Sequence, residues 1–425
     1  MNRIPSIALL LALLLMAGCA APATTPATTA APPIVIGVPT DLGTIEGQDA
    51  LNSALLAVDE INAKGGVNVG GAQRLLQIES IDTREAGAGI PVNDALQAVE
   101  KLILEKEPDA IVVGAFRSEV LMASLDLIAK YKIPYLVTIA ATPALQQRVT
   151  ESYDSYKYFF RLGLNGSGVG MYLTQAMGFL AQEFNFSRAY LTYQDVAWAK
   201  GTADGVAKWL TDNGWEVVGN DAYPIGATEF STSLSKAIDG KADVIMPIFD
   251  MPQAGILLKQ ARSMQAPALL AGFISPVAPA TAWETFEGDV DGMVNLMFEI
   301  GPLPVQAVPA SVQFNDNYAK KFGEEARAKL SGHGPGPSYD AVYVLAAAIE
   351  RAGTLDGDAL VTALEATDMQ GVIGRIKFGE DHQVIFGLDP KETALGVVFQ
   401  WRDGKRIPVF PPAVAEGEIE VPASE

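Results

Sequence analysis

Few residues of this chain have side chains suited to covalent, metal or redox chemistry. The 425 residues include one cysteine and two histidines, His333 and His382, and neither histidine has further ligands at zinc-site spacing. His333 lies in the stretch SGHGPGP, where we expect a solvated loop residue. The glycines of GLNGSGVG (163–170) fit neither a dinucleotide-binding nor a Walker A pattern. We therefore expect no enzyme, no metal site and no cofactor.

The single cysteine, Cys19, favours lipid attachment. It follows the apolar run 7–16 and the small residues Ala17 and Gly18, and Arg3 precedes the run. The run has half of the roughly 20 residues that a membrane-spanning helix needs, and the pattern is typical of a secretion signal. Small residues directly before a cysteine indicate a bacterial lipoprotein signal. The alternative is an ordinary signal peptide with a chance cysteine near its cleavage site.

The segment after this signal peptide (1–18) is predicted to be a tether. Residues 20–33, AAPATTPATTAAPP, contain only Ala, Thr and Pro. Such a segment cannot bury a core and behaves as an extended spacer. We expect a lipid on Cys19 to anchor the chain and residues 19–33 to hold a folded domain clear of the membrane. The domain would lie in the periplasm or at the outer face of the cell membrane.

Composition indicates a folded, acidic protein. Hydrophobic residues make up 49% of the chain, which is enough for sizeable cores. The formal net charge of −20 argues against nucleic-acid binding, which depends on neutralisation of phosphates by Lys and Arg. Because Cys19 is the sole cysteine, the domain is expected to be stabilised by packing rather than by disulfides.

From Ile34 onward, short apolar strands alternate with amphipathic helices, which predicts α/β halves built on parallel sheets. The strands expected in the first half are 34–38, 75–82, 109–114 and 133–138, and its helices are 47–63, 93–105 and 120–130. The strands expected in the second half are 188–193, 216–220, 243–249 and 268–273, and its helices are 200–213, 230–238 and 252–264. Ligands of such sheets bind beyond the carboxyl ends of the strands, so function should concentrate in the loops there.

Six stretches of this sequence carry a family resemblance. They are AVDEINAKGGV (57–67), VVGAFRSEV (112–120), ATPAL (141–145), LLKQARSM (257–264), SYDAVYVLAAAIERAG (338–353) and VVFQWRDGK (397–405). In this order and spacing they resemble the leucine/isoleucine/valine-binding protein family, the type I periplasmic solute-binding proteins of amino-acid ABC transporters. Members include receptors for amides, urea and aromatic acids, so the resemblance specifies the fold better than the ligand.

The resemblance, which covers about 34–408, implies a two-lobed type I periplasmic-binding-protein fold. Each lobe is a parallel-rich sheet flanked by helices, and the chain crosses between lobes three times. The implied lobe one is 34–163 plus 299–371, and the implied lobe two is 164–298 plus 372–410. The remaining residues, 411–425, form an acidic tail that we expect to be loosely held.

The resemblance also implies a carboxylate site in the first lobe. In the family a serine hydroxyl and backbone amides hold the ligand's α-carboxylate, and Ser118 matches that serine. It is expected where a helix begins after a strand, a position that favours an anion, with a plain helix cap as the alternative. A Gly-Ala-Thr stretch gives the second contact in the family; Ile139, Ala140 and Ala141 replace it here, and Thr142 follows. Ser118, Ala140, Ala141 and Thr142 are therefore candidate contacts.

Four more candidate contacts include departures from the family pattern. Trp198 matches an aromatic residue that packs over the ligand, with a core role as the alternative. Glu46 replaces a tryptophan of branched-chain amino-acid binders, and Asp250, beside Phe249, replaces a tyrosine. The stretch 272–276 should supply a carboxylate for the ligand's ammonium but has none. An amino-acid ligand would therefore need Glu46 or Asp250 as its counter-charge, although a solvated loop carboxylate is the alternative for Glu46.

These observations favour a lipid-anchored, monomeric receptor of an ABC importer that captures an amino acid or a related small carboxylate. Its expected partners are the solute, a membrane permease and the membrane itself, with no nucleic acid. The alternatives are a sensory receptor with the same fold but without transport, or a binder of an amide, a urea-like compound or an aromatic acid. An enzyme is the least favoured class, since no nucleophile–base pair is visible.

Overall fold

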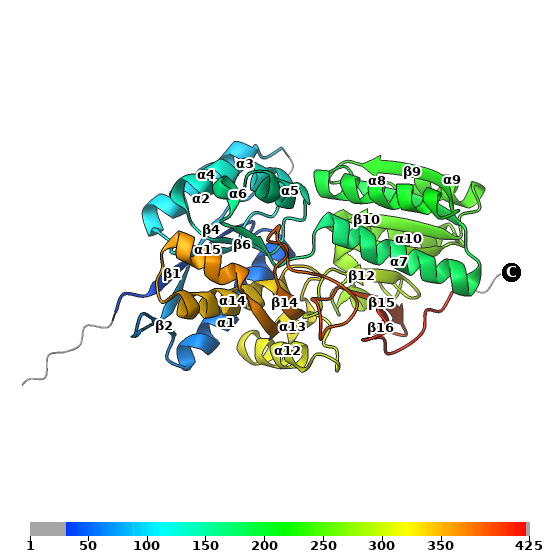
Figure 1. Cartoon of the computed structure of the whole chain (residues 1–425). Coiled ribbons are helices and arrows are strands. Elements are labelled where there is room, and N and C mark those ends of the chain that lie inside the picture. Colours follow the sequence, from blue (N-terminus) through cyan, green and yellow to red (C-terminus); the bar gives the residue numbers. More distant parts are fainter. Residues whose placement is uncertain (1–30, 88, 422–425) are drawn as a thin grey trace, which may run out of the picture. The chain divides into compact units, whose positions relative to one another are not determined.

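The structure of the protein is a computed structural model that describes residues 31–87 and 89–421. The predicted signal peptide, Cys19 and most of the predicted tether lie outside these residues. From Pro32 onward the chain forms one unit, drawn as ribbons in Figure 1. No helix in the described part of the chain combines the length and the apolarity needed to cross a membrane.

The first sheet has five parallel strands in the order β4-β1-β5-β6-β7. They are β1 (Ile34–Thr40), β4 (Leu76–Asp82), β5 (Ala110–Val113), β6 (Tyr135–Val137) and β7 (Phe159–Arg161). The connecting elements are α1 (Ile45–Ala63), β2 (Val67–Val69), β3 (Ala72–Arg74), α2 (Val92–Lys106), α3 (Ser118–Ala123), α4 (Leu125–Tyr131), α5 (Ala144–Glu151) and α6 (Tyr153–Tyr156). Strands β5 and β6 are buried along their length, which explains their continuous apolar sequences.

The second sheet has seven strands in the order β16-β15-β12-β11-β10-β8-β9. They are β8 (Arg188–Gln194), β9 (Glu216–Tyr223), β10 (Val244–Phe249), β11 (Leu269–Ile274), β12 (Val294–Met297), β15 (Val397–Arg402) and β16 (Lys405–Phe410). The first five are parallel, and β15 and β16 are antiparallel additions. The helices are α7 (Gly166–Phe184), α8 (Ala197–Asp212), α9 (Ser231–Asp239), η1 (Pro252–Ala254), α10 (Gly255–Ser263), η2 (Ser275–Val277) and α11 (Ala282–Thr285).

The segment after β12 returns to the first sheet. It contains α12 (Pro309–Phe322), α13 (Glu324–Ala328), α14 (Pro335–Ala352), α15 (Gly357–Glu365), β13 (Asp368–Gly371) and β14 (Gly374–Lys377). Helix α14 packs against α1, although the two lie at opposite ends of the sequence (Figure 1). Its buried face, including Val342 and Leu345, belongs to the hydrophobic cluster around the five-stranded sheet. The first lobe therefore combines early and late parts of the chain.

The predicted two-lobed α/β architecture is confirmed, and so are the predicted strands and helices, to within a few residues at their ends. Two expected helices are divided: the one over 120–130 at Ser124 into α3 and α4, and the one over 252–264 into the 3-10 turn η1 and α10. The lobe boundaries at 163/164, 298/299 and 371/372 stay predictions. The predicted boundary at 371/372 assigns the residues between Ile373 and Ala394 to lobe two, but their apolar side chains pack in the cluster of the five-stranded sheet.

The beginning of the acidic tail is packed, so the expectation of a loose tail is wrong for residues 411–421. Val414 and Ile419 are buried. The Gln400 side chain donates to the Glu420 carbonyl at 2.7 Å and accepts from the Glu420 N–H at 2.9 Å. These hydrogen bonds hold the tail against β15. The few apolar residues of the tail alternate with acidic ones, and they pack at the edge of a hydrophobic cluster.

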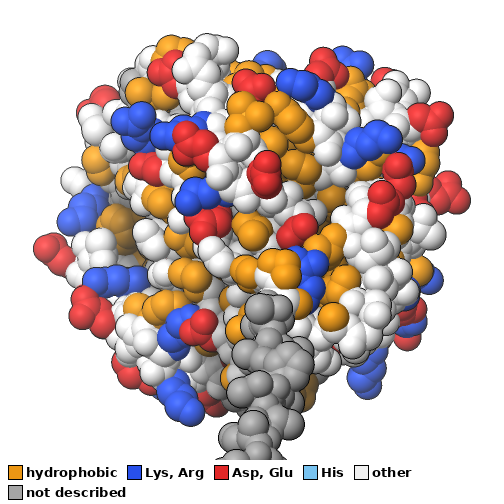
Figure 2. All heavy atoms as spheres, turned by 90° about the vertical axis from the view of Figure 1, so that its left-hand side faces the viewer, with side chains coloured by type: hydrophobic (Ala, Val, Ile, Leu, Met, Phe, Trp, Pro, Cys, Tyr) orange, Lys and Arg blue, Asp and Glu red, His pale blue; other side chains and the backbone are white. Residues whose placement is uncertain are grey.

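Charges of both signs are interspersed on the face of the molecule seen in Figure 2, and Lys and Arg do not gather there into an extended basic area.

Candidate functional site

A small cavity lies where loops at the carboxyl ends of both sheets meet. The nine residues that line it are Glu46, Phe116, Ile139, Ala141, Trp198, Asp250, Phe273, Phe298 and His333. Its volume of about 20 Å³ is close to that of a single water molecule. The cleft is therefore closed, and a solute could enter only if the two lobes moved apart.

Glu46 enters this cavity from the first turn of α1. Thr44 caps the helix by accepting the N–H of Gly47 at 3.1 Å, which fixes where the helix starts. The carboxyl group of Glu46 is buried and accepts a hydrogen bond from the Ser275 hydroxyl of the second lobe. Burial raises its pKa to about 7, against the opposing effect of the Ser275 hydrogen bond. Glu46 is thus a buried residue that joins the two lobes, and the solvated-loop alternative does not hold.

Asp250 and Trp198 form the wall on the second lobe. Asp250 follows β10, and the Trp198 indole N–H, in the first turn of α8, donates to its carboxylate at 2.7 Å. The Gln194 side chain accepts the N–H groups of Asp250 and Met251 at 3.2 and 2.9 Å, which fixes the loop. Burial raises the pKa of Asp250, while the bond from Trp198 opposes this. Trp198 both lines the cavity and packs in a hydrophobic cluster.

Aromatic side chains close the remaining walls. The Trp198 ring meets Phe273 and Phe298 edge to face, with both centroid distances 5.9 Å. Phe116 faces the cavity from the loop between β5 and α3 of the first lobe. The site therefore combines two carboxyl groups with aromatic surfaces.

His333 corrects the sequence-based expectation, because it is buried in the cavity wall rather than solvated. Its Nδ1 lies 3.1 Å from the Glu299 carboxylate and its Nε2 lies 2.6 Å from the Ile139 carbonyl. Burial alone would lower the pKa of His333, but the Glu299 carboxylate, the hydrogen bond to the Ile139 carbonyl and the Glu46 carboxylate together raise it. Since both nitrogens face acceptors, the ring carries both protons.

A signal for this placement was present in the sequence. Pro335 is the first residue of α14, and proline is typical of the first helical position. The Gly/Pro stretch around His333 is thus a helix start rather than a free loop. Phe116, Phe273 and Phe298 were not predicted, since nothing in their local sequence separates a cavity wall from a core. Ile139 was predicted only as part of the stretch that replaces Gly-Ala-Thr.

The predicted carboxylate contacts lie together beside the cavity. The Ser118 hydroxyl, in the first residue of α3, accepts the Thr142 N–H at 3.2 Å, and Ala140 N–H donates to the Ala115 carbonyl at 3.2 Å. The Thr142 carbonyl accepts from the buried Arg161 guanidinium at 2.8 Å. Of these candidates only Ala141 reaches the cavity wall. The amides of Ala140 and Thr142 are satisfied internally in this closed form.

Phe249 lies away from the cavity walls. Its ring is fully buried at the end of β10 and meets Phe230 edge to face at 5.7 Å, with Tyr223 at 6.3 Å. The structure therefore gives it a place in the hydrophobic cluster of the second lobe.

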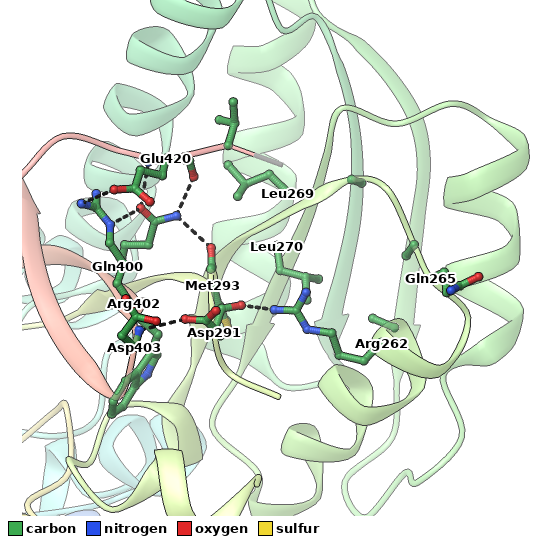
Figure 3. Close-up of a pocket in the computed structure, with 16 residues that line it drawn as sticks. Arg262, Gln265, Leu269, Leu270, Asp291, Met293, Gln400, Arg402, Asp403 and Glu420 are labelled. Atoms are coloured by element: carbon green, nitrogen blue, oxygen red, sulfur yellow. Dashed lines mark hydrogen bonds and ion pairs between the residues drawn. The ribbon is translucent and has the colours of Figure 1, made fainter. Parts of the chain in front are cut away.

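A larger cavity of about 550 Å³ lies at the other end of the second sheet, where β11 and β12 begin (Figure 3). Arg402 forms an ion pair with Glu420 at 2.9 Å there, and the Arg262 guanidinium donates to the backbone carbonyl of Asp291. Parallel sheets bind ligands at the carboxyl ends of their strands. The smaller cavity lies at that end and contains two carboxyl groups that form no ion pair with Lys or Arg in the described residues, so it is the candidate site.

Comparison with known proteins decides the family. A sequence model described as "Periplasmic binding protein" matches residues 33–396. The chain belongs to the periplasmic binding protein family. Such proteins work outside the cytoplasm and bind small solutes.

Individual relatives agree with the family. The binding protein is 25% identical over 388 residues to "Leu/Ile/Val-binding protein homolog 7" of Brucella suis, covering 88% of this chain and 90% of that one. The branched-chain amino-acid transporter substrate-binding protein of Streptococcus pneumoniae, in complex with isoleucine, has a TM-score of 0.69 at 21% identity over 88% and 97% of the chains. The R. palustris solute-binding protein, in complex with benzoate, has a TM-score of 0.71 at 17% identity over 92% and 100%. The two structures share the fold yet hold different solutes.

Proposed function

We propose that this binding protein is the receptor of an ABC importer and captures an amino acid or a related small carboxylate between its lobes. The observation that carries the proposal is the cavity at the carboxyl ends of both sheets, whose wall combines Glu46 of one lobe with Trp198 and Asp250 of the other. A solute held by groups of both lobes favours the closed form, which a permease can then recognise.

The proposed contacts assign a role to each end of an amino acid. Glu46 and Asp250 receive the ammonium group, since no other acidic residue lines the described cavity. The carboxylate lies toward Ser118 and the backbone around Ala141, and its oxygens replace Ser118 as the acceptor of the Thr142 N–H. Trp198 packs over the ligand.

The proposal places the protein outside the cytoplasm. A lipid on Cys19 and the Ala/Thr/Pro tether would keep a monomeric receptor within reach of a permease in the same membrane. Uptake of the labelled solute distinguishes an importer receptor from a sensory receptor. If the receptor serves an importer, a strain lacking it fails to accumulate the solute. Unchanged uptake would contradict the importer role.

The binding step is tested by a thermal-shift screen of the full-length protein in detergent against amino acids, amides, amines and aromatic acids. A solute at 100 times its Kd adds about 2.7 kcal/mol to the free energy of unfolding, which raises the melting temperature measurably. Ser118→Ala should weaken binding of a solute with a carboxylate and leave its decarboxylated analogue unaffected. A screen without any stabilising solute would contradict the receptor function.

A further inference from the structure

The walls of the central cavity carry more negative than positive charge. Its nine lining residues include the acids Glu46 and Asp250 and no Lys or Arg. The one basic residue in the wall is His333, and Glu299 balances its charge through an ion pair of 3.1 Å. His333 also acts on Glu46 and Asp250 and lowers the pKa of each, but with Glu299 there are three carboxyl groups to this one basic side chain. A solute in this cavity therefore faces two carboxyl groups that form no ion pair with Lys or Arg in the described residues.

Both carboxyl groups rely on neutral hydrogen-bond donors. Glu46 accepts from the Ser275 hydroxyl, and Asp250 accepts from the Trp198 indole N–H at 2.7 Å. In the part of the chain that the structure describes, no Lys or Arg forms an ion pair with either residue. A buried carboxylate without a counter-charge costs several kcal/mol, of which a neutral donor offsets only part.

Closure brings these two acids together from opposite lobes. Glu46 belongs to α1 beside the first sheet, whereas Asp250 follows β10 in the second. Burial raises the pKa of Glu46 to about 7, and the nearby Asp250 carboxylate adds to the rise. A cation between the two would supply the missing charge, so it would favour closure of the lobes. Because the cavity described here has room for about one water molecule, the lobes would close around the cation less tightly than they do here.

The aromatic walls also favour a cation. Trp198, Phe273 and Phe298 surround one side of the cavity and Phe116 stands on the other. The faces of aromatic rings attract ammonium and guanidinium groups, by about 0.5–2 kcal/mol each. A solute whose only charge is negative would meet two acids in these aromatic walls.

We propose that the solute is a small organic cation whose protonated amine or guanidinium group lies between Glu46 and Asp250, in contact with Trp198. The inference rests on the proposed receptor function and assigns its solute a net positive charge. Basic amino acids fall within the class proposed above, and simple amines without a carboxylate extend it. It also explains why the acid expected within 272–276 is missing: the counter-charge comes from two other loops.

The first experiment compares cations with neutral molecules of the same shape. Full-length protein is titrated calorimetrically with arginine and citrulline, lysine and norleucine, and choline and 3,3-dimethylbutanol, with leucine and benzoate as neutral and anionic references. At least one cation should bind, with its neutral partner about tenfold weaker or worse. If leucine, benzoate or a neutral partner binds while the cations do not, the receptor function stands and the cation inference is wrong. If nothing in this or the wider screen binds, the receptor function itself fails.

The second experiment removes each charge. Glu46→Gln and Asp250→Asn should each weaken binding of the cation by about tenfold and change binding of its neutral partner much less. The matched control is Glu284→Gln, an exposed residue of α11 outside the cavity, which should leave both affinities unchanged. Equal losses for the cation and its neutral partner would overturn the inference, with circular dichroism confirming that each variant is folded.

The third measurement needs no variant. The groups beside the cavity whose pKa is raised are Glu46, Asp250 and His333, together with Asp49 next to Glu46. A bound cation lowers their proton affinity, so binding at about pH 7 should release protons. Calorimetry in two buffers of different ionisation enthalpy measures that release. Proton uptake, or no proton exchange at any pH between 6 and 8, would contradict a cation beside these groups.

Discussion

At the scale of single residues, the His333–Glu299 pair links the cavity wall to the segments that join the lobes. Glu299 accepts the Leu164 N–H at 2.6 Å and the Gly334 N–H at 3.4 Å in addition to His333. His333 in turn donates to the Ile139 carbonyl at 2.6 Å. One carboxylate therefore holds the chain where it leaves β7 and where it leaves β12, both of them predicted crossovers.

This pair should be strongly coupled. His333→Gln or Glu299→Gln alone leaves a buried charge without a partner and should lower the free energy of unfolding by about 3–5 kcal/mol. The double variant should cost less than the sum, because neither charge remains. Urea denaturation of the four proteins measures this coupling.

The control uses the other histidine. His382 also lies between a carbonyl and a carboxylate, those of Phe159 and Glu365, at 3.0 Å each, but Glu365 is exposed to solvent. His382→Gln should therefore cost clearly less than His333→Gln. Additive losses for His333 and Glu299 would contradict the coupling.

At the scale of elements, the helix starts after the strands position the site. Helix α1 begins at Ile45 because Thr44 caps it, and the cap places Glu46 in the first turn. Helix α15 begins in the same way, with Asp356 accepting the Ala359 N–H at 3.0 Å, but it supplies no residue to the cavity wall. Removing each cap in turn therefore distinguishes the effect of a cap on stability from its effect on binding.

Thr44→Ala and Asp356→Ala should each lower the free energy of unfolding by about 1 kcal/mol, since each removes an N-cap. Solute affinity should fall several-fold only in Thr44→Ala, because fraying of α1 displaces Glu46. Urea denaturation and calorimetric titration with the solute found by screening measure the two effects. Equal affinities of the two variants would contradict the dependence of Glu46 on its cap.

At the scale of the whole molecule, buried carboxyl groups make stability depend on pH. Burial raises the pKa of Glu46, Asp49 and Asp340 to about 7 in each case. Between about pH 4 and pH 7 the folded protein keeps protons that the unfolded chain releases, so stability is present at the lower pH and is lost as pH rises. The raised pKa of His333 acts in the same direction, and so does self-repulsion at a net charge of −20.

The solute-free protein should therefore be more stable at pH 5 than at pH 8, by at least a few kcal/mol, since each group contributes about 1.4 kcal/mol per pH unit within its window. Urea denaturation at several pH values measures this. Asp340→Asn should flatten the dependence, because Asp340, which accepts the Val372 and Ile373 N–H groups at 2.9 Å each, no longer titrates. Stability that rises from pH 5 to pH 8 would contradict the prediction.

The sequence predicted the elements well because their signals are local. Apolar runs such as that of β5 indicate buried strands, and the spacing of apolar residues in α1 indicates a helix with one buried face. The resemblance added candidate positions in the loops after the strands, and Glu46, Ala141, Trp198 and Asp250 do line one cavity.

The sequence by itself determined the α/β elements, the acidic composition and the loops in which a site could form, since each depends on neighbouring residues or on a simple count. Only the tertiary structure decided which side chains meet. His333 is buried because α14 returns to the first lobe, where Glu299 from another part of the chain balances its charge. Glu46 and Asp250 share a cavity because the lobes close on each other. Burial and charge pairing arise from contacts between residues distant in sequence, which no local pattern records.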